Sequence, residues 1–221
     1  MVKDTIIALL KPQMMMRLLV STVGIAMTCF AVSIFYLTDL GSDPYQVLCI
    51  SVHLLLGISH GTANTLLNGF IILFMLLFKR KYIKISVFLC LVVSGPMVDF
   101  FNFILTPVIG PWLPLWIRFI LIPLGCFLMG AGIFVYTAPN LGASPADSLG
   151  IIAADSIGKP YHIVRIGMDA GYTFLGALLG GPVGLTTIFS ILLTGPCMGF
   201  VKKHCENLPF FRALAPCTPE H

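Results

Sequence analysis

Ionisable side chains inside apolar stretches are the residues of this chain that could do chemistry. Arg165 and Asp169 lie four residues apart in the apolar stretch 162–180, so a helix would place them on one face. A guanidinium can bind an anionic group, and a carboxyl group can carry a proton or a cation. The alternative is that Arg165 reaches a membrane interface and Asp169 merely pairs with it. We favour a binding site, in which Arg165 holds an anionic group of a solute.

Asp99 is the sharpest single candidate, because it follows Ser94-Gly95-Pro96 near the middle of another apolar stretch. A carboxyl group at that depth in a bilayer is costly unless it is paired or protonated, and such acids are often functional. The alternative is a structural carboxyl group that bonds to Asn102 or pairs with Arg118. The sequence alone leaves both roles open.

The chain contains two copies of one unit, and this repeat relates the candidate residues to one another. LGSDP at 40–44 returns 101 residues later as LGASP at 141–145. The same offset matches Asn64 and Asn68 to the arginine and aspartate of the 162–180 stretch, so both copies keep two polar positions. Further matched pairs are Arg17 and Arg118, Gly24 and Gly125, Gly57 and Gly158, and, after a one-residue shift, Gly95-Pro96 and Gly195-Pro196. Duplicated units in membrane proteins typically place a solute site where the halves meet.

The composition indicates a membrane protein. Of 221 residues, 57% are hydrophobic and only 10% are charged, whereas soluble domains carry about a quarter charged residues. A spanning helix needs roughly 20 apolar residues, and six stretches qualify: 17–37, 61–78, 84–105, 117–137, 162–180 and 183–201. We find no CxxC pair, GxSxG, HExxH or phosphate loop, and no basic stripe with aromatic residues. We therefore expect no enzyme, no cofactor, no metal site and no nucleic-acid partner.

Two shorter apolar segments, 44–57 and 145–157, begin with helix-start signals. Asp43 and Ser144 are good N-caps, and proline follows each. At about 1.5 Å per residue these segments reach only some 20 Å, too short to span a bilayer comfortably. Their N-termini would carry partial positive charge, with Asp147 in the first turn of the second. We interpret them as re-entrant helices, and interfacial amphipathic helices are the alternative.

The basic residues predict the orientation of the chain. Lys79-Arg80-Lys81 forms the densest basic cluster and places its loop in the cytoplasm with the N-terminal segment 1–16. The chain must then cross the membrane an even number of times between the N-terminal segment and this loop. Two long apolar stretches and the short segment 44–57 lie between them, so the short segment cannot be a crossing. Each copy, 17–106 and 117–203, crosses three times, so the second is inserted in the opposite orientation. The tail 204–221 is then cytoplasmic.

The LGSDP and LGASP boxes, the paired Gly-Pro motifs, Arg17 and Arg118 resemble those of the bacterial YczE/YitT-like family of integral membrane proteins. The resemblance covers about 17–203. It implies a protein of the bacterial plasma membrane with duplicated halves and a transport-related role. It carries over no substrate and no binding residue.

We therefore predict an all-α polytopic membrane protein with six transmembrane helices and two short re-entrant or interfacial helices in an inverted-topology repeat. The function that we favour is a secondary transporter or channel for a small solute. The alternative is a membrane-embedded scaffold or accessory subunit that transports nothing and binds another membrane protein; a homodimer is possible in either case. The predicted solute site joins residues of the first copy to residues of the second: Asp43, Asn64, Asn68 and Asp99 face Ser144, Asp147, Arg165 and Asp169.

Overall fold

The computed structural model describes residues 12–109, 112–205, 207–209 and 211. These residues form α-helices and one short 3₁₀ turn, with no strand among them, as expected for an all-α protein. The elements are α2 (Pro12–Thr38), α3 (Pro44–Leu56), α4 (His60–Phe78), η1 (Arg80–Tyr82), α5 (Ile85–Leu105), α6 (Leu115–Thr137), α7 (Pro145–Ile157), α8 (Tyr161–Leu178) and α9 (Leu185–Cys205). Most of the expected N-terminal segment 1–16 and of the tail 204–221 lies outside the described residues.

Five of these helices are long and apolar enough to cross a membrane: α2, α4, α5, α6 and α9. The expected span 162–180 forms α8, which is 18 residues long. Its arginine and aspartate make it less apolar than the five, and it is not among them. The count of six crossings therefore stays a prediction.

The two sequence copies fold into matching series of helices. The series α2 to α5 is repeated by α6 to α9, and the short helices α3 and α7 are both 13 residues long. Each ends at a glycine in the left-handed conformation, Gly57 at φ 63° and Gly158 at φ 68°. Glycine adopts this conformation without a steric penalty. The bounds of both short helices agree with the predicted segments.

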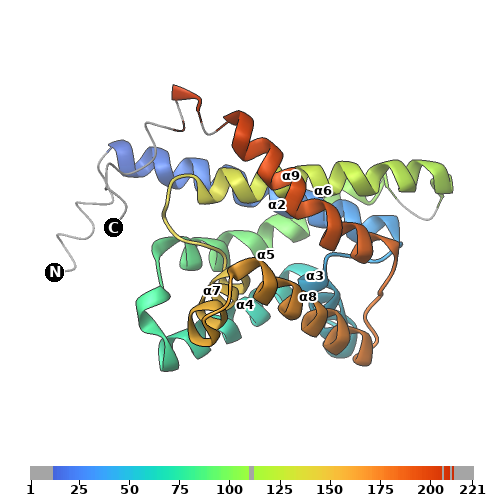
Figure 1. Cartoon of the computed structure of the whole chain (residues 1–221). Helices are drawn as coiled ribbons and strands as arrows, with labels where there is room; N and C mark the ends of the chain where they lie inside the picture. The colour runs from blue at the N-terminus through green and yellow to red at the C-terminus, as the bar shows by residue number, and fades with distance from the viewer. Residues whose placement is uncertain (1–11, 110–111, 206, 210, 212–221) are drawn as a thin grey trace.

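The first helices of the two copies, α2 and α6, pack side by side and antiparallel (Figure 1). A Cβ atom at Gly24 would lie 2.3 Å from the Tyr136 nitrogen, and one at Gly125 would lie 2.4 Å from Phe35 Cε1. Gly24 and Gly125 are equivalent in the repeat, and so are Phe35 and Tyr136. The contacts are therefore reciprocal, which places an approximate two-fold axis between the copies.

The same reciprocity extends to the loops and the short helices. The Thr186 N–H donates to the Leu40 carbonyl at 3.0 Å, and the Ser86 N–H donates to the Leu141 carbonyl at 3.2 Å. The short helix α3 packs against α8 of the second copy, and α7 packs against α4 of the first. Each copy thus completes its packing with helices of the other.

The helices form two layers. In Figure 1, α2, α6 and α9 lie above α3, α4, α7 and α8, with α5 between them. The main buried cluster, which includes Ile25, Phe35 and Ile122, lies between α2, α5 and α6. Large apolar side chains also cover the outer surface, where Phe103 is 82% exposed. An exterior of this kind suits a molecule surrounded by lipid.

Candidate functional site

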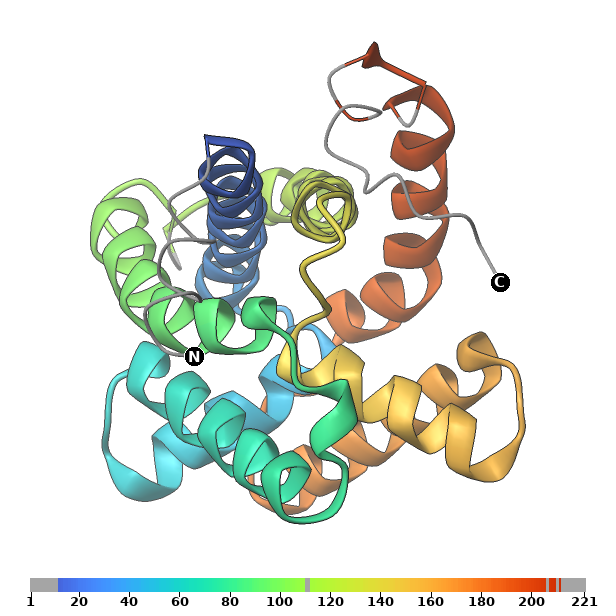
Figure 2. The same ribbon diagram turned by 90° about the vertical axis from the view of Figure 1, so that its left-hand side faces the viewer.

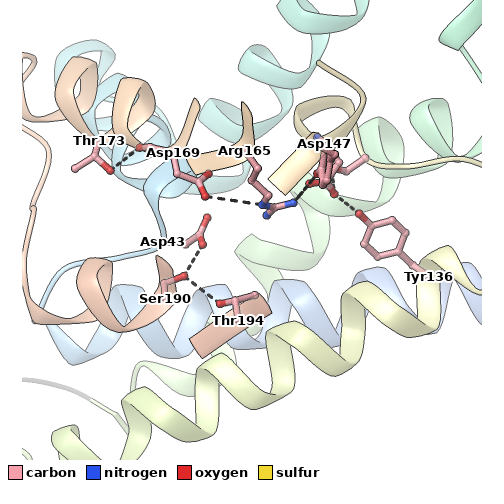
Figure 3. Close-up of polar contacts among 10 residues, drawn as sticks. Asp43, Tyr136, Asp147, Arg165, Asp169, Thr173, Ser190 and Thr194 are labelled. Carbon is pink, nitrogen blue, oxygen red and sulfur yellow. Dashed lines mark hydrogen bonds and ion pairs between the residues drawn. The ribbon is translucent and has the colours of Figure 1, made fainter. Parts of the chain in front are cut away.

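An ion pair between α7 and α8 forms the centre of the candidate site (Figure 3). The Arg165 Nη1 atom donates to Asp147 Oδ1. The Arg165 Nε atom lies 3.8 Å from Asp169 Oδ2, one turn further along α8. The prediction that Arg165 and Asp169 share a helix face is confirmed. The guanidinium also has a second carboxylate partner in Asp147.

The Asp147 carboxylate is surrounded by donors from three helical elements. It accepts a hydrogen bond from the Tyr136 hydroxyl of α6 and one from the Ser144 hydroxyl at 2.8 Å. Ser144 caps α7 as predicted, because its Oγ atom accepts from the Asp147 N–H at 3.1 Å. The Tyr161 hydroxyl accepts from Arg165 at 2.9 Å and lies 3.4 Å from Asp147. Charge-assisted bonds of this kind hold the carboxylate in one position.

Asp43 comes from the first copy and reaches into the second. It occupies the predicted N-cap position of α3, but its side chain makes no capping bond. Its Oδ1 atom instead accepts from the Ser190 hydroxyl of α9 at 2.6 Å, and Ser190 lies 3.3 Å from Thr194 Oγ1. Among the described residues, no basic side chain lies within ion-pair distance of Asp43. Figure 3 shows this carboxyl group between Ser190 and the Arg165–Asp169 pair.

Two adjoining cavities meet at these charges. The first has a volume of about 110 Å³, and the second, between α8 and α9, has a volume of about 270 Å³. Asp43 and Arg165 line both cavities. The first is lined by six of the eight predicted residues, namely Asp43, Asn64, Asn68, Ser144, Asp147 and Arg165, and Asp169 lines the second. Seven of the predicted residues therefore gather where the two copies meet.

The first copy contributes a neutral hydrogen-bonded network to the smaller cavity. Asn64 and Asn68 of α4 are each only 3% exposed. The Asn64 amide donates to the Ser94 hydroxyl at 3.1 Å, and Asn68 Oδ1 accepts from the Tyr45 hydroxyl at 2.9 Å. These bonds satisfy amides that would otherwise be costly to bury. The site is thus asymmetric, with amides on one side and charges on the other, as the sequence predicts.

The structure does not bring Asp99 to this site. Its Oδ1 atom accepts from the Gly61 N–H at 2.8 Å and its Oδ2 atom from the Ser59 hydroxyl at 2.6 Å. These partners lie at the start of α4, where free N–H groups attract a carboxylate. The expectation that Asp99 faces the second copy is therefore not met. Its partners are also neither of the two structural alternatives, Asn102 and Arg118.

Sequence reasoning missed several polar residues that line the cavities: Gln46, Tyr136, Tyr161, Ser190 and Thr194. A signal existed for Thr194, because Thr194-Gly195-Pro196 repeats Ser94-Gly95-Pro96 and keeps a hydroxyl in front of both Gly-Pro motifs. No comparable signal marks Ser190, whose counterpart in the first copy is Cys90.

Comparisons with known proteins identify a matching family and similar uncharacterised proteins. Residues 15–203 match a model described as "Family of unknown function (DUF6198)". The "Uncharacterized membrane protein YczE" of Bacillus subtilis is 32% identical over 86% of this chain and 87% of its own length. An "Uncharacterized protein" of Haemophilus influenzae is 27% identical over 84% of this chain and 86% of its own length. No solved structure matches the chain.

Proposed function

The chain belongs to the family of unknown function DUF6198 and is a YczE-like multi-pass membrane protein; from this premise we propose that it is a secondary transporter or channel for a small solute. The observation that carries the proposal is the group of charged residues between the two copies, which lines both cavities. Charges at such a position are costly and mark solute or ion pathways in membrane proteins. The setting we propose is the bacterial plasma membrane, with both termini in the cytoplasm.

The antiparallel packing of α2 and α6 supports an inverted-topology repeat. If both helices span the bilayer, their opposite directions require the two copies to be inserted with opposite orientations. The short helices follow the same rule. The α3 residue Ser51 donates to the Gly176 carbonyl near the end of α8 at 2.8 Å. In α7, Asp155 accepts from the Tyr82 hydroxyl beyond the end of α4 at 2.5 Å. We therefore propose that α3 and α7 are re-entrant, starting at the site and ending near opposite faces.

The charges at the site favour a solute or coupling ion that is cationic. Three carboxyl groups, those of Asp43, Asp147 and Asp169, face one guanidinium. Arg165 already pairs with Asp147, so it is not free to hold the anionic group that we assigned to it from the sequence. The charges of Asp43 and Asp169 are compensated less closely by Arg165 than the charge of Asp147 is. We propose that they hold a proton, a metal cation or the cationic group of the solute.

Neutralising Asp43 is expected to lower uptake strongly. Purified protein would first be screened by thermal stability against small amines, amino acids and monovalent cations, because specific binding raises apparent stability. The radiolabelled solute identified in this way would then be supplied to proteoliposomes. We expect Asp43→Asn to lower uptake by about tenfold or more, since one lost ionic contact of 1.4 kcal/mol changes affinity tenfold.

The matched control for that experiment is Asp39→Asn. Asp39 is exposed and lies four residues before Asp43 at φ 55°, a left-handed conformation that asparagine also adopts. Uptake by Asp39→Asn should equal that of the unchanged protein. Equal uptake by both variants would exclude Asp43 from the binding site.

The proposed topology predicts that two loops lie on opposite sides of the membrane. In Lys81→Cys the new thiol should react with a membrane-impermeant maleimide only after the cells are permeabilised. In Trp112→Cys it should react in intact cells. Both residues are exposed, and the labelled peptide would be identified by mass spectrometry. Labelling of both positions from one side would exclude three crossings per copy.

One observation also favours the alternative of an accessory subunit. The Arg165–Asp147 pair joins α7 to α8 and would stabilise the fold even if no solute were bound. Purified protein that moves no solute but retains a second membrane protein would support this function.

A further inference from the structure

In this structure α8 and α9 lie apart, whereas α4 and α5 lie together. We propose that α8 and α9 close when α4 and α5 open, and that this exchange makes the site accessible from the other side of the membrane. Asp99 acts in this device as a latch on the closed pair. The inference rests on the proposed transport function and adds the moving parts to it. In inverted repeats, alternating access commonly arises from one repeat moving against the other around a fixed site.

The closed pair, α4 and α5, has its backbones in contact. A Cβ atom at Gly61 would lie 2.1 Å from the Gly95 carbonyl oxygen. One at Gly95 would lie 2.0 Å from Thr65 Oγ1 and 3.4 Å from Thr65 Cβ. No side chain fits at Gly61 in this arrangement, and one at Gly95 would displace the Thr65 hydroxyl. Small residues permit such close approach between membrane helices.

The equivalent pair, α8 and α9, is open. Gly195 corresponds to Gly95, yet a Cβ atom placed on it would meet no other atom within 4 Å. The two helices contact each other far less than α4 and α5 do. The second cavity of the candidate site, of about 270 Å³, lies between them and has Ile166, Thr194 and Gly195 in its lining. Figure 2 shows α9 (red) turning away from α7 and α8 (yellow to orange), while α5 (green) lies on α4 (teal).

In the part of the chain that the structure describes, the hydrogen bonds also join α4 to α5 but do not join α8 to α9. Ser94 of α5 accepts from the Asn64 amide at 3.1 Å and lies 3.5 Å from Asn68 Nδ2, which ties α5 to α4. Among the described residues, the corresponding hydroxyl of Thr194 lies within hydrogen-bond distance of Ser190, which belongs to its own helix, and of no residue of α8. Its potential partners, Arg165 and Asp169, face the cavity instead. Closing α8 onto α9 would bring these charges to Thr194.

Asp99 accounts for the difference. It joins α5 to the first turn of α4 through the Ser59 hydroxyl at 2.6 Å and the Gly61 N–H at 2.8 Å. The counterpart of Asp99 in α9 is Gly199, which has no side chain, and a Cβ atom placed on it would meet no other segment within 4 Å. The second pair therefore lacks a latch. Since both hydrogen bonds of Asp99 are charge-assisted, the latch biases α4 and α5 toward the closed arrangement.

The open gap lies at one end of the site. Its lining runs from Tyr161 and Arg165 in the first turns of α8 to Met198 in the second half of α9. In the proposed topology these ends face the cytoplasm, whereas Ser59 and Asp99 lie toward the outside. We therefore assign this structure to an inward-facing state whose outer gate is closed by the latch.

Matched cysteine pairs test the exchange. Thr65→Cys with Gly95→Cys should form a disulfide readily, because the 3.4 Å between their Cβ atoms is close to the usual spacing. Ile166→Cys with Gly195→Cys is the equivalent pair in α8 and α9. It should form a disulfide only when the second pair closes. Full-length protein with its native cysteines would be oxidised in proteoliposomes, and the disulfides would be mapped by mass spectrometry.

We expect both disulfides to form and each to stop uptake, with uptake restored by reduction. Absence of the Ile166→Cys/Gly195→Cys disulfide in protein that still takes up solute would overturn the exchange and leave the transport function standing. Formation of both disulfides, in variants that move no solute even after reduction, would support the exchange and overturn transport. The two proposals therefore fail in different ways.

Removing the latch gives a second test, which does not depend on the Thr65→Cys/Gly95→Cys pair. Asp99→Asn, added to the Ile166→Cys/Gly195→Cys variant, should speed disulfide formation severalfold, because weakening the closed α4–α5 pair shifts the population toward the exchanged state. An unchanged or slower rate would show that Asp99 is not a latch. Asp155→Asn, which removes a carboxylate of α7 outside both gates, is the matched control and should leave the rate unchanged.

Discussion

Replacing Arg165 with glutamine is expected to lower the free energy of unfolding by about 1–3 kcal/mol. Removing one partner of a fully buried ion pair costs about 3–5 kcal/mol, because the other charge stays buried without compensation. Arg165 is 36% exposed and Asp147 15%, so solvent reduces this penalty. The loss would be measured as a fall in the apparent melting temperature of the detergent-solubilised protein.

A second substitution should restore most of that stability. In the double variant Arg165→Gln/Asp147→Asn, position 147 no longer carries a negative charge without its guanidinium, and only the weaker contact of Asp169, at 3.8 Å from Arg165, stays lost. The coupling between the two substitutions should therefore be about 1–2 kcal/mol. Uptake by the double variant should stay below that of the unchanged protein, because Asp169 has lost its ion pair with Arg165. Additive losses in the double variant would mean that the ion pair does not hold α7 to α8. The control is Lys159→Gln, which changes an exposed basic residue in the loop between α7 and α8. This substitution should leave the melting temperature unchanged.

Placing a single methyl group on Gly24 should cost about 2 kcal/mol or more. In an ordinary exposed helix, Gly→Ala gains up to about 1 kcal/mol. At Gly24 the new Cβ atom would lie 2.3 Å from the Tyr136 backbone nitrogen, so α2 and α6 must separate. Overpacking of this kind typically costs about 1–3 kcal/mol. The loss of stability would be read as a lower melting temperature and less folded protein in membranes.

The glycines of the repeat supply graded controls for this substitution. Gly125→Ala meets the ring of Phe35 at 2.4 Å, and a side chain yields more readily than a backbone, so its loss should be smaller. Gly167→Ala meets no atom within 4 Å and should be neutral or slightly stabilising. If Gly24→Ala behaves as Gly167→Ala does, then α2 and α6 are not in close contact in the membrane.

The elements defined by local sequence could be predicted closely. Proline at the first helical position and glycine after the last fix the ends of α3 and α7, and their bounds agree with the predicted segments. The cap by Ser144 is a bond to a residue three positions away, and local sequence is enough to predict it. The four-residue spacing of Arg165 and Asp169, which brings them to one face of α8, is likewise predictable from local sequence.

Contacts between distant segments could not be predicted. The Asp43 side chain leaves its own helix for Ser190, which lies 147 residues away, because the two-fold packing brings α9 to the start of α3. Asp99 similarly bonds to Ser59 and Gly61 of a neighbouring helix. Its depth in an apolar stretch indicates that it needs a partner, but the rotation of α5 decides which partner it meets. The repeat showed that two halves exist, but it did not show that α8 and α9 stand apart.

The reciprocal packing of the short helices has a consequence for biosynthesis. The first copy is synthesised before the second, so α3 leaves the ribosome without α8, the helix against which it packs in the finished protein. The carboxyl group of Asp43 likewise has no hydroxyl partner until Ser190 has been translated. The first half must therefore stay incompletely assembled in the lipid while the remainder of the polypeptide is made, and assembly can finish only near the end of translation.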